Sequence, residues 1–191
     1  MTVLSRQVRI PSQRAVPTIL RSPAGRGVAV LLGTDHHPFD RLVEWAATLA
    51  AGSPDPWFVQ HGSSQLHPEL DGRRMLGGRE LTRLLGSVDV VVTHGGPGLI
   101  MEARAARHIP IVVPRDPALG EHVDGHQIRF AQRLDERGDI RLVNSLDQLR
   151  EAVELAKVMG RIAADVPTQR AETTVRFGEL VDQLHQRARR R

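Results

Sequence analysis

The stretch of sequence that decides the fold runs from residue 94 to residue 127. It begins His94-Gly95-Gly96-Pro97-Gly98, passes Glu102, and continues through Ile111-Val112-Val113-Pro114-Arg115 to Gly120-Glu121-His122-Val123-Asp124-Gly125-His126-Gln127. A glycine turn opens a helix here, and a second apolar run delivers a polar loop. In an open α/β sheet, such loops and the helix N-termini beside them form nucleotide sites. The stretch therefore predicts an α/β fold with a nucleotide site at one edge of the sheet.

Apolar runs alternate with amphipathic segments along the rest of the chain. We expect strands over residues 28–32, 57–60, 74–76, 88–93, 109–113 and 140–143. We expect helices over residues 39–51, 79–85, 97–106, 127–135, 146–159 and 171–187. This alternation predicts a doubly wound, Rossmann-like parallel sheet with right-handed crossovers. The loops at Gly33, His94 and Pro114 then lie at the carboxyl edge, where ligands bind.

Composition and charge exclude several classes of protein. The 191 residues include no cysteine, so neither a disulfide framework nor a thiolate metal site is possible. The formal net charge is +4, but arginines gather in both tails and acidic residues outnumber basic ones between them. A nucleic-acid-binding domain usually carries a basic face with stacking aromatics, and aromatic residues make up only 3% of this chain. We therefore expect no nucleic-acid partner.

The chain divides into three parts. Residues 1–26 form a basic, poorly ordered extension, residues 27–165 a nucleotide-sugar-binding domain, and residues 166–191 a C-terminal helix with a basic tail. The basic tails suit an anionic membrane surface or an acidic partner, and solvated, disordered ends are an equally good interpretation. No apolar run approaches the roughly 18 residues that span a bilayer, and the N-terminus has no signal-peptide core. We expect a soluble, cytoplasmic chain.

The ordered set of motifs over residues 28–160 resembles a family of glycosyltransferases built from two facing Rossmann-like domains (GT-B type). It includes Gly33-Thr34 and the segment Pro38-Phe39-Asp40-Arg41-Leu42-Val43-Glu44-Trp45, in addition to the stretch quoted above. The chain is most similar to the donor-binding C-terminal domain of the bacterial peptidoglycan N-acetylglucosaminyltransferase. Within that group it resembles the small subunits of two-chain transferases, namely the catalytic subunit of the dolichol-pathway N-acetylglucosaminyltransferase and the small subunits of exopolysaccharide glycosyltransferases.

The resemblance implies a set of donor-binding residues. His94 would contact a donor phosphate, with further N–H donors from the glycine loop, and Glu102 would accept hydrogen bonds from the ribose hydroxyls. Gly33 and Thr34 would offer a second phosphate-binding turn, and Arg115, His126 and Gln127 would reach the sugar. The full donor-binding set is Gly33, Thr34, His94, Gly95, Gly96, Gly98, Glu102, Arg115, His126 and Gln127.

Simpler interpretations exist for several of these residues. Gly33-Thr34 could be an ordinary turn in which Thr34 or Asp35 caps a helix, and Glu102 could be a solvated helix residue. Asp124 could cap the next helix. His122, Asp124 and His126 are clustered, but their spacing matches no standard metal set and transferases of this fold generally work without a metal, so we expect none.

The implied reaction is inverting displacement at the anomeric carbon of a UDP-sugar, with no cofactor. His94 and the glycine loop would stabilise the leaving diphosphate. The acceptor would be a polyprenyl-linked saccharide used in cell-surface polysaccharide synthesis. Because the chain matches only the donor half, a membrane-anchored acceptor-binding subunit is implied, and it would hold this chain peripherally at the inner face of the membrane. The resemblance implies that this subunit supplies the catalytic base. Within the present chain, Glu121 and His36 are the weaker candidates for that base.

Two departures from the family pattern favour an alternative function. Leu99 stands where the family usually has a phosphate-binding serine, and Arg107 stands where it tends to have glycine. The alternative is a non-catalytic nucleotide-sugar-binding or scaffolding subunit of a membrane complex. A sugar-nucleotide epimerase shares the architecture, but it normally needs two domains in one chain.

Overall fold

A computed structural model describes residues 27–161 of the chain. It contains one six-stranded sheet in the order β3-β2-β1-β4-β5-β6, and every strand pair is parallel. The strands are β1 (Val28–Leu31), β2 (Trp57–Gln60), β3 (Asp71–Arg73), β4 (Val90–His94), β5 (Ile111–Val113) and β6 (Arg141–Leu142). The predicted Rossmann-like fold is therefore confirmed, because this strand order is the one typical of doubly wound nucleotide-binding sheets.

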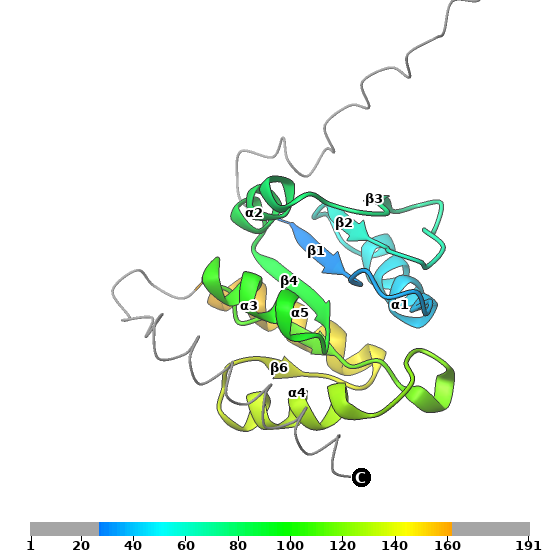
Figure 1. Cartoon of the computed structure of the whole chain (residues 1–191). Helices are drawn as coiled ribbons and strands as arrows, with labels where there is room; N and C mark the ends of the chain where they lie inside the picture. The colour runs from blue at the N-terminus through cyan, green and yellow to red at the C-terminus, as the bar shows by residue number, and fades with distance from the viewer. Residues whose placement is uncertain (1–26, 162–191) are drawn as a thin grey trace, which may run out of the picture.

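Five α-helices connect the strands: α1 (Asp40–Ala51), α2 (Gly78–Ser87), α3 (Pro97–Ala105), α4 (His126–Glu136) and α5 (Leu146–Met159). Helices α1 and α5 cover one face of the sheet, while α2, α3 and α4 cover the other (Figure 1). A short 3₁₀ helix, Pro117–Leu119, follows β5.

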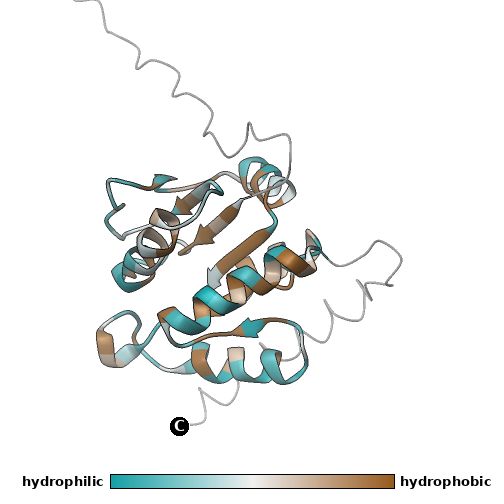
Figure 2. Cartoon of the chain, turned by 180° about the vertical axis from the view of Figure 1, so that it is seen from behind, coloured by the Kyte–Doolittle hydropathy of each residue, from teal (hydrophilic) through white to brown (hydrophobic). Residues whose placement is uncertain are grey.

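The central strands are short apolar runs because both of their faces are buried. All four residues of β1 are fully buried, and alternate β1 side chains enter the core on opposite faces of the sheet. The helices are amphipathic, so that in Figure 2 their brown stripes turn toward the sheet and their teal residues face outward. Helix α5 begins at Ser145, whose hydroxyl accepts the Gln148 N–H at 3.2 Å.

The predicted strand over residues 74–76 is wrong. The third strand is Asp71–Arg73, which pairs with Phe58–Gln60 of β2. This polar strand lies at the edge of the sheet and is held there by backbone hydrogen bonds to β2. The prediction was misplaced because it followed the apolar pair Met75-Leu76. The other predicted elements between residues 27 and 161 are present; β2 and α5 have the predicted bounds, and the rest differ at one or both ends. The helix expected over residues 171–187 and both predicted tail segments lie outside the described residues.

Candidate functional site

The strand order reverses between β1 and β4, and the candidate site lies there. These two strands are parallel neighbours, so their carboxyl ends bring Gly33 and His94 to one edge of the sheet. The loop that follows β5 reaches the same edge, because β5 pairs with β4. In doubly wound sheets this reversal opens the crevice in which ligands bind. The loops after β1, β4 and β5 therefore lie together at the carboxyl edge of the sheet, where the candidate site is expected.

The imidazole of His94 lies in a slot between two glycines. A Cβ added to Gly33 would lie 2.5 Å from His94 Nε2, and one added to Gly96 would lie 2.1 Å from His94 Cε1. Gly33 also has φ +81°, a conformation that favours glycine. Both positions therefore need glycine for a reason that the sequence did not reveal, which is to make room for the His94 ring.

The surroundings of His94 fix its tautomer and lower its pKa. The Gly96 N–H donates to His94 Nδ1 at 3.1 Å, which places the lone pair of the ring on this nitrogen. Gln127 Oε1 lies farther away, at 3.4 Å from Nδ1, and as an acceptor it does not bond to that lone pair. Burial and the positive charge of Arg115 lower the pKa of His94 to about 4, against the opposing effects of Gln127 and Asp35. The ring is therefore neutral at pH 7 and keeps its proton on Nε2, beside Gly33. A neutral N–H donor in this position suits an anionic oxygen.

The low pKa of His94 predicts a specific loss of stability in acid. Between the ordinary histidine pKa of about 6.5 and the folded value of about 4, the unfolded chain binds a proton that the folded chain does not. The free energy of unfolding should therefore fall as pH falls through this window, with a His94 contribution on the order of 2 kcal/mol after allowance for partial exposure. Urea denaturation at several pH values measures it.

His94→Gln should flatten this pH dependence. A shallower slope will remain, because burial also lowers the pKa of His108. Asp35 affects the free energy of unfolding at lower pH. Its pKa is lowered from 3.8 to about 2, so its stabilising contribution is lost as pH falls between these two values. If His94→Gln left the slope between pH 6.5 and 4 unchanged, the neutral state of His94 would be contradicted.

Helix α3 points its N-terminus into the site. Gly96 is the N-cap and Pro97 the first helical residue. The N–H groups of Gly98 and Leu99, which follow, have no intrahelical acceptor, so they can meet a phosphate. Gly95 is buried, and a Cβ there would lie 3.0 Å from Gln127 Cβ.

Two side chains of α3 differ in their surroundings. Glu102 is exposed, and its carboxylate makes no hydrogen bond or ion pair with the part of the chain that the structure describes. Leu99 is half-buried and packs against the core under α2 and α3. The leucine that replaces the usual serine therefore contributes to packing, while its backbone N–H remains at the helix N-terminus.

The loop after β1 offers fewer N–H donors than expected. The Gly33 N–H donates to Gln60 Oε1 at 2.9 Å, and Gln60 Nε2 donates back to the Gly33 carbonyl at 2.8 Å. Helix α1, which starts six residues beyond Thr34, carries the acidic Asp40 in its first turn. Thr34 is exposed. The Gly33 N–H is therefore already bonded within the protein, and Thr34 is the exposed residue of this turn.

Arg115 lies beneath the loops, where it ties them together. Its side chain is only 2% exposed. Nη1 donates to the carbonyls of His37 at 2.8 Å and Glu121 at 3.0 Å, and Nη2 donates to the carbonyl of Leu32 at 2.9 Å. The guanidinium also lies 4.9 Å from the centre of the Phe39 ring. These contacts assign Arg115 to joining the β1 and β5 loops rather than to the donor sugar.

Glu121 belongs to the same buried network. Its carboxylate forms a two-point ion pair with Arg41, at 2.8 Å to Nε and 2.7 Å to Nη2, and also accepts the Asp116 N–H at 2.8 Å. Arg41 Nη2 donates in addition to the Pro114 carbonyl at 3.1 Å. A carboxylate held in this way is already satisfied, so the structure favours a positioning role for Glu121 over proton transfer.

The remaining predicted residues divide between surface and interior. His126, the first residue of α4, is exposed and its Nδ1 contacts the Asp124 carboxylate. Gln127 is 5% exposed and lies behind the glycine loop beside His94. The structure thus places His126 near the surface at the start of α4 and places Gln127 beside His94.

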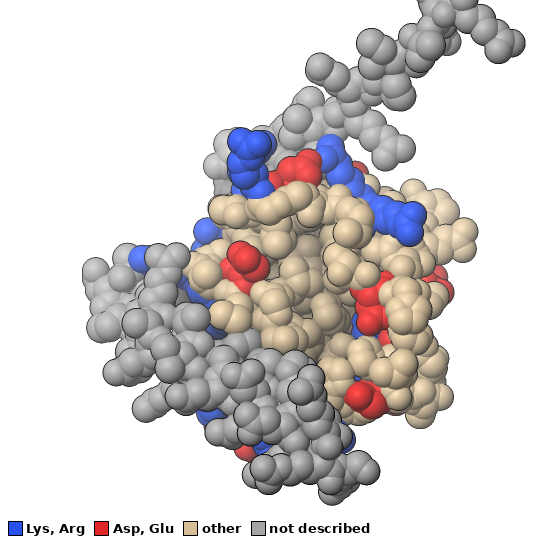
Figure 3. Space-filling view, in the orientation of Figure 1, with Lys and Arg blue, Asp and Glu red and all other residues tan. Residues whose placement is uncertain are grey.

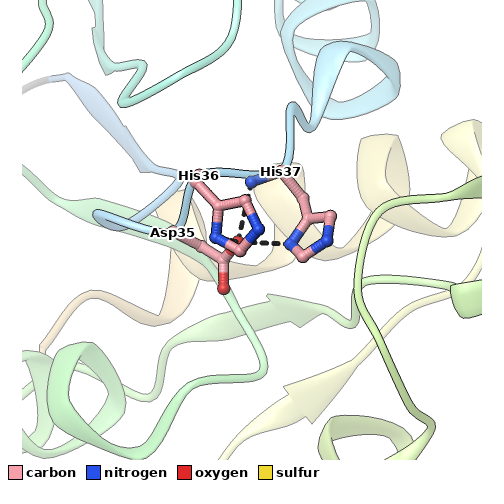
Figure 4. Close-up of side chains that lie close together, drawn as sticks. All are labelled: Asp35, His36 and His37. Atoms are coloured by element: carbon pink, nitrogen blue, oxygen red, sulfur yellow. Dashed lines mark hydrogen bonds and ion pairs between the residues drawn. The ribbon is translucent and has the colours of Figure 1, made fainter.

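Some residues of the site were missed in the sequence. The Asp35 carboxylate accepts both the backbone N–H of His37 at 2.8 Å and the His37 Nδ1–H at 2.7 Å (Figure 4). The backbone N–H and ring of His37, together with Arg115, outweigh burial and lower the pKa of Asp35 to about 2. Gln60 and Arg41 were also missed as site-forming residues. Only the Asp-x-His spacing gave a local signal, because Gln60 and Arg41 meet partners 27 and 80 residues away.

The comparison with protein-family models gives one match. The model described as "Glycosyltransferase family 28 C-terminal domain" matches residues 79–174 of the chain, about half its length. The chain belongs to this family. The match contains the glycine loop, Glu102, Arg115 and the His122–His126 segment, so the family assignment rests on most of the site. No curated protein sequence matches the chain.

Solved structures of glycosyltransferases share the fold of this family 28 domain. The glycosyltransferase of kitacinnamycin is 25% identical with a TM-score of 0.52, over 71% of this chain and 36% of that one. The calicheamicin glycosyltransferase CalG4 is 18% identical with a TM-score of 0.55, over 82% and 38% of the two chains. VinC in complex with DTDP is 19% identical with a TM-score of 0.51, over 93% and 45%.

The family 28 domain thus spans less than half of each of these structures. Its fold matches the C-terminal domain of GT-B glycosyltransferases. On the face seen in Figure 3, most of the described surface is uncharged; basic residues lie mainly at its upper end, and acidic residues are scattered. No helix among the described residues has both the length and the apolar character needed to cross a membrane.

Proposed function

We propose that the chain is the donor-binding catalytic subunit of a UDP-sugar-dependent, inverting glycosyltransferase. The observation that carries the proposal is the position of His94. Its neutral imidazole is fixed between Gly33 and Gly96, beside the free N–H groups at the N-terminus of α3. This arrangement offers hydrogen-bond donors to a diphosphate without placing a second positive charge there. Family membership supports the same assignment.

In this proposal each residue has a distinct task. The Nε2–H of His94 and the N–H groups of Gly98 and Leu99 hold the diphosphate, and Glu102 accepts hydrogen bonds from the ribose hydroxyls. When the acceptor oxygen attacks the anomeric carbon, the bond from that carbon to the phosphate oxygen breaks and UDP leaves as an anion. The same donors stabilise the negative charge that develops on UDP. The acceptor's proton goes to a base on a partner subunit.

The partner requirement is part of the proposal. The chain spans less than half of the glycosyltransferases whose fold it shares. We propose that a second, acceptor-binding polypeptide completes the active site. We propose that this partner is membrane-anchored, that the acceptor is a polyprenyl-linked saccharide of cell-surface polysaccharide synthesis, and that the chain lies at the inner membrane face. A nucleotide-sugar-binding subunit without catalytic activity remains the alternative, which Leu99 in place of serine favours.

Calorimetric titration of UDP into the purified chain tests the donor site, with ADP and dTDP as comparisons. We expect UDP to bind and Glu102→Ala to weaken it by roughly ten- to a hundredfold, because a charge-assisted hydrogen bond contributes about 1.5–3 kcal/mol. Glu151→Ala, which removes an exposed glutamate from α5, is the matched control and should bind like the wild type. Equal binding of UDP by the Glu102 and Glu151 variants would overturn the ribose assignment.

A further inference from the structure

Six titratable residues from two distant loops meet beside the candidate donor site. The loop after β1 provides Asp35, His36 and His37, and the loop before α4 provides His122, Asp124 and His126. The sequence suggested only the second set, because more than 80 residues separate the loops. The structure brings His122 Nε2 to 3.8 Å from Asp35 Oδ2, which joins the two sets.

The two ring nitrogens of His122 face different groups. The Asp124 backbone N–H points at Nδ1 at 3.3 Å, so Nδ1 carries the lone pair. The proton is then on Nε2, which faces the Asp35 carboxylate. Asp35 is ionised at neutral pH, because the backbone N–H and the ring N–H of His37 donate hydrogen bonds to its carboxylate and stabilise the charged form. His122 is only 11% exposed, so it has little freedom to turn away from this arrangement.

A metal on His122 Nδ1 would replace the long contact of this nitrogen with the Asp124 N–H at 3.3 Å, and two further ligand groups lie beside it. Its Nδ1 lies 3.8 Å from Asp124 Oδ1, and His126 Nδ1 contacts the same carboxylate oxygen. One potential ligand atom from each of His122, Asp124 and His126 lies within 4.8 Å of the others. Asp124 and His126 are exposed, so an ion could enter from solvent.

We propose that His122, Asp124 and His126 bind a divalent transition-metal ion of the zinc class, with Asp35 as the outer carboxylate that orients His122. Two imidazoles and one carboxylate are ligands that zinc and its neighbours prefer. A histidine that binds a metal through one nitrogen usually donates its other N–H to a carboxylate or carbonyl. His122 Nε2 faces the Asp35 carboxylate at 3.8 Å, so a small movement of the ring on metal binding would complete such a hydrogen bond. Remaining coordination positions would hold water or another oxygen ligand.

The Asp35, His36 and His37 set is a poorer metal site by itself. Asp35 Oδ1 already accepts both the N–H and the ring N–H of His37. His36 is 84% exposed, and its Nδ1 lies 3.6 Å from the same oxygen. This inference goes beyond the proposed function, because transfer by the mechanism above needs no metal. The ion would fix the loop between Gly120 and His126 at the edge of the donor site.

Cobalt and zinc titrations test the proposal on the full chain, expressed without a histidine tag. We expect one Co²⁺ per chain with visible d–d absorption, displaced by Zn²⁺, and micromolar or tighter Zn²⁺ affinity by calorimetry. His122→Gln and Asp124→Asn should weaken Zn²⁺ binding by at least roughly tenfold, and Asp35→Asn by roughly ten- to a hundredfold as an outer carboxylate. His67→Gln, in the loop before β3 and not among the clustered ligand groups, should have no effect.

Two controls separate the possible failures. Circular dichroism establishes that each variant is folded, and Asp124→Asn is conservative and exposed, so it should fold even if His122→Gln does not. UDP binding in the presence of a chelator tests the donor site without the metal. The metal proposal is overturned if millimolar Co²⁺ gives no spectrum, or if the spectrum survives His122→Gln and Asp124→Asn but is lost in His36→Gln.

Discussion

Replacing Arg115 with methionine is expected to lower the free energy of unfolding by about 3–5 kcal/mol, the cost typical of removing one partner from a buried charged network. The guanidinium donates to three backbone carbonyls at 3.0 Å or less, and methionine fills a similar volume without a donor. The carbonyls of Leu32, His37 and Glu121 would remain buried without it. Chemical denaturation measures the change.

The Arg115 prediction has a graded series of controls. Arg79→Met, at an exposed position in α2, should change stability by no more than about 0.5 kcal/mol. Arg115→Lys should fall between the two, because a single ammonium keeps the charge but cannot reach all three carbonyls with the geometry of a guanidinium. A stability loss in Arg115→Met no greater than that in Arg79→Met would refute the view that Arg115 joins the loops.

Gly96→Ala is expected to displace His94 and to weaken UDP binding by more than roughly tenfold, since one charge-assisted hydrogen bond to the diphosphate would be lost. The new Cβ would lie 2.1 Å from His94 Cε1, and the Gly33 side of the slot leaves the ring no room to retreat. Overpacking of this kind should also reduce stability by about 1–3 kcal/mol. Calorimetry with UDP and thermal denaturation measure the two effects.

A double-mutant cycle isolates the cause. In a His94→Ala background the clash is absent, so Gly96→Ala should cost little, and a coupling energy of about 1–3 kcal/mol should appear between the two positions. Gly86→Ala, in the last turn of α2 with open space around its Cβ, is the matched control and should bind UDP normally. Additive effects of the two substitutions at positions 94 and 96 would mean that the slot does not constrain the ring.

The fold was predictable because its signals are local. Each central strand is a short buried apolar run, and the glycine turn after β4 is followed at once by a proline-started helix. Local signals failed for β3, whose residues Asp71–Arg73 have no apolar pattern and are placed only by pairing with β2. At an edge strand, ladder hydrogen bonds outweigh hydrophobicity.

The sequence indicated where the candidate site lies in the fold, but it indicated less well what each side chain contacts there. His94, Glu102 and the α3 N-terminus were found because they follow one another within a single strand–turn–helix unit. The tasks of Arg115 and Glu121 could not be read in the same way, because their partners Leu32 and Arg41 lie 83 and 80 residues away. Only the folded sheet brings these loops together. In it, Arg115 and Glu121 are buried and bonded to other loops of the protein, although the sequence suggested roles at the ligand.

The two edge strands restrict how another polypeptide can join this domain. β3 has three residues and β6 only two, and each includes an arginine. Strand addition needs a longer run of unpaired backbone groups, and short charged edges are a common defence against it. We therefore expect a partner chain to dock through side chains of the loops or helices, which would make the assembled enzyme two separate sheets facing each other and not one continuous sheet.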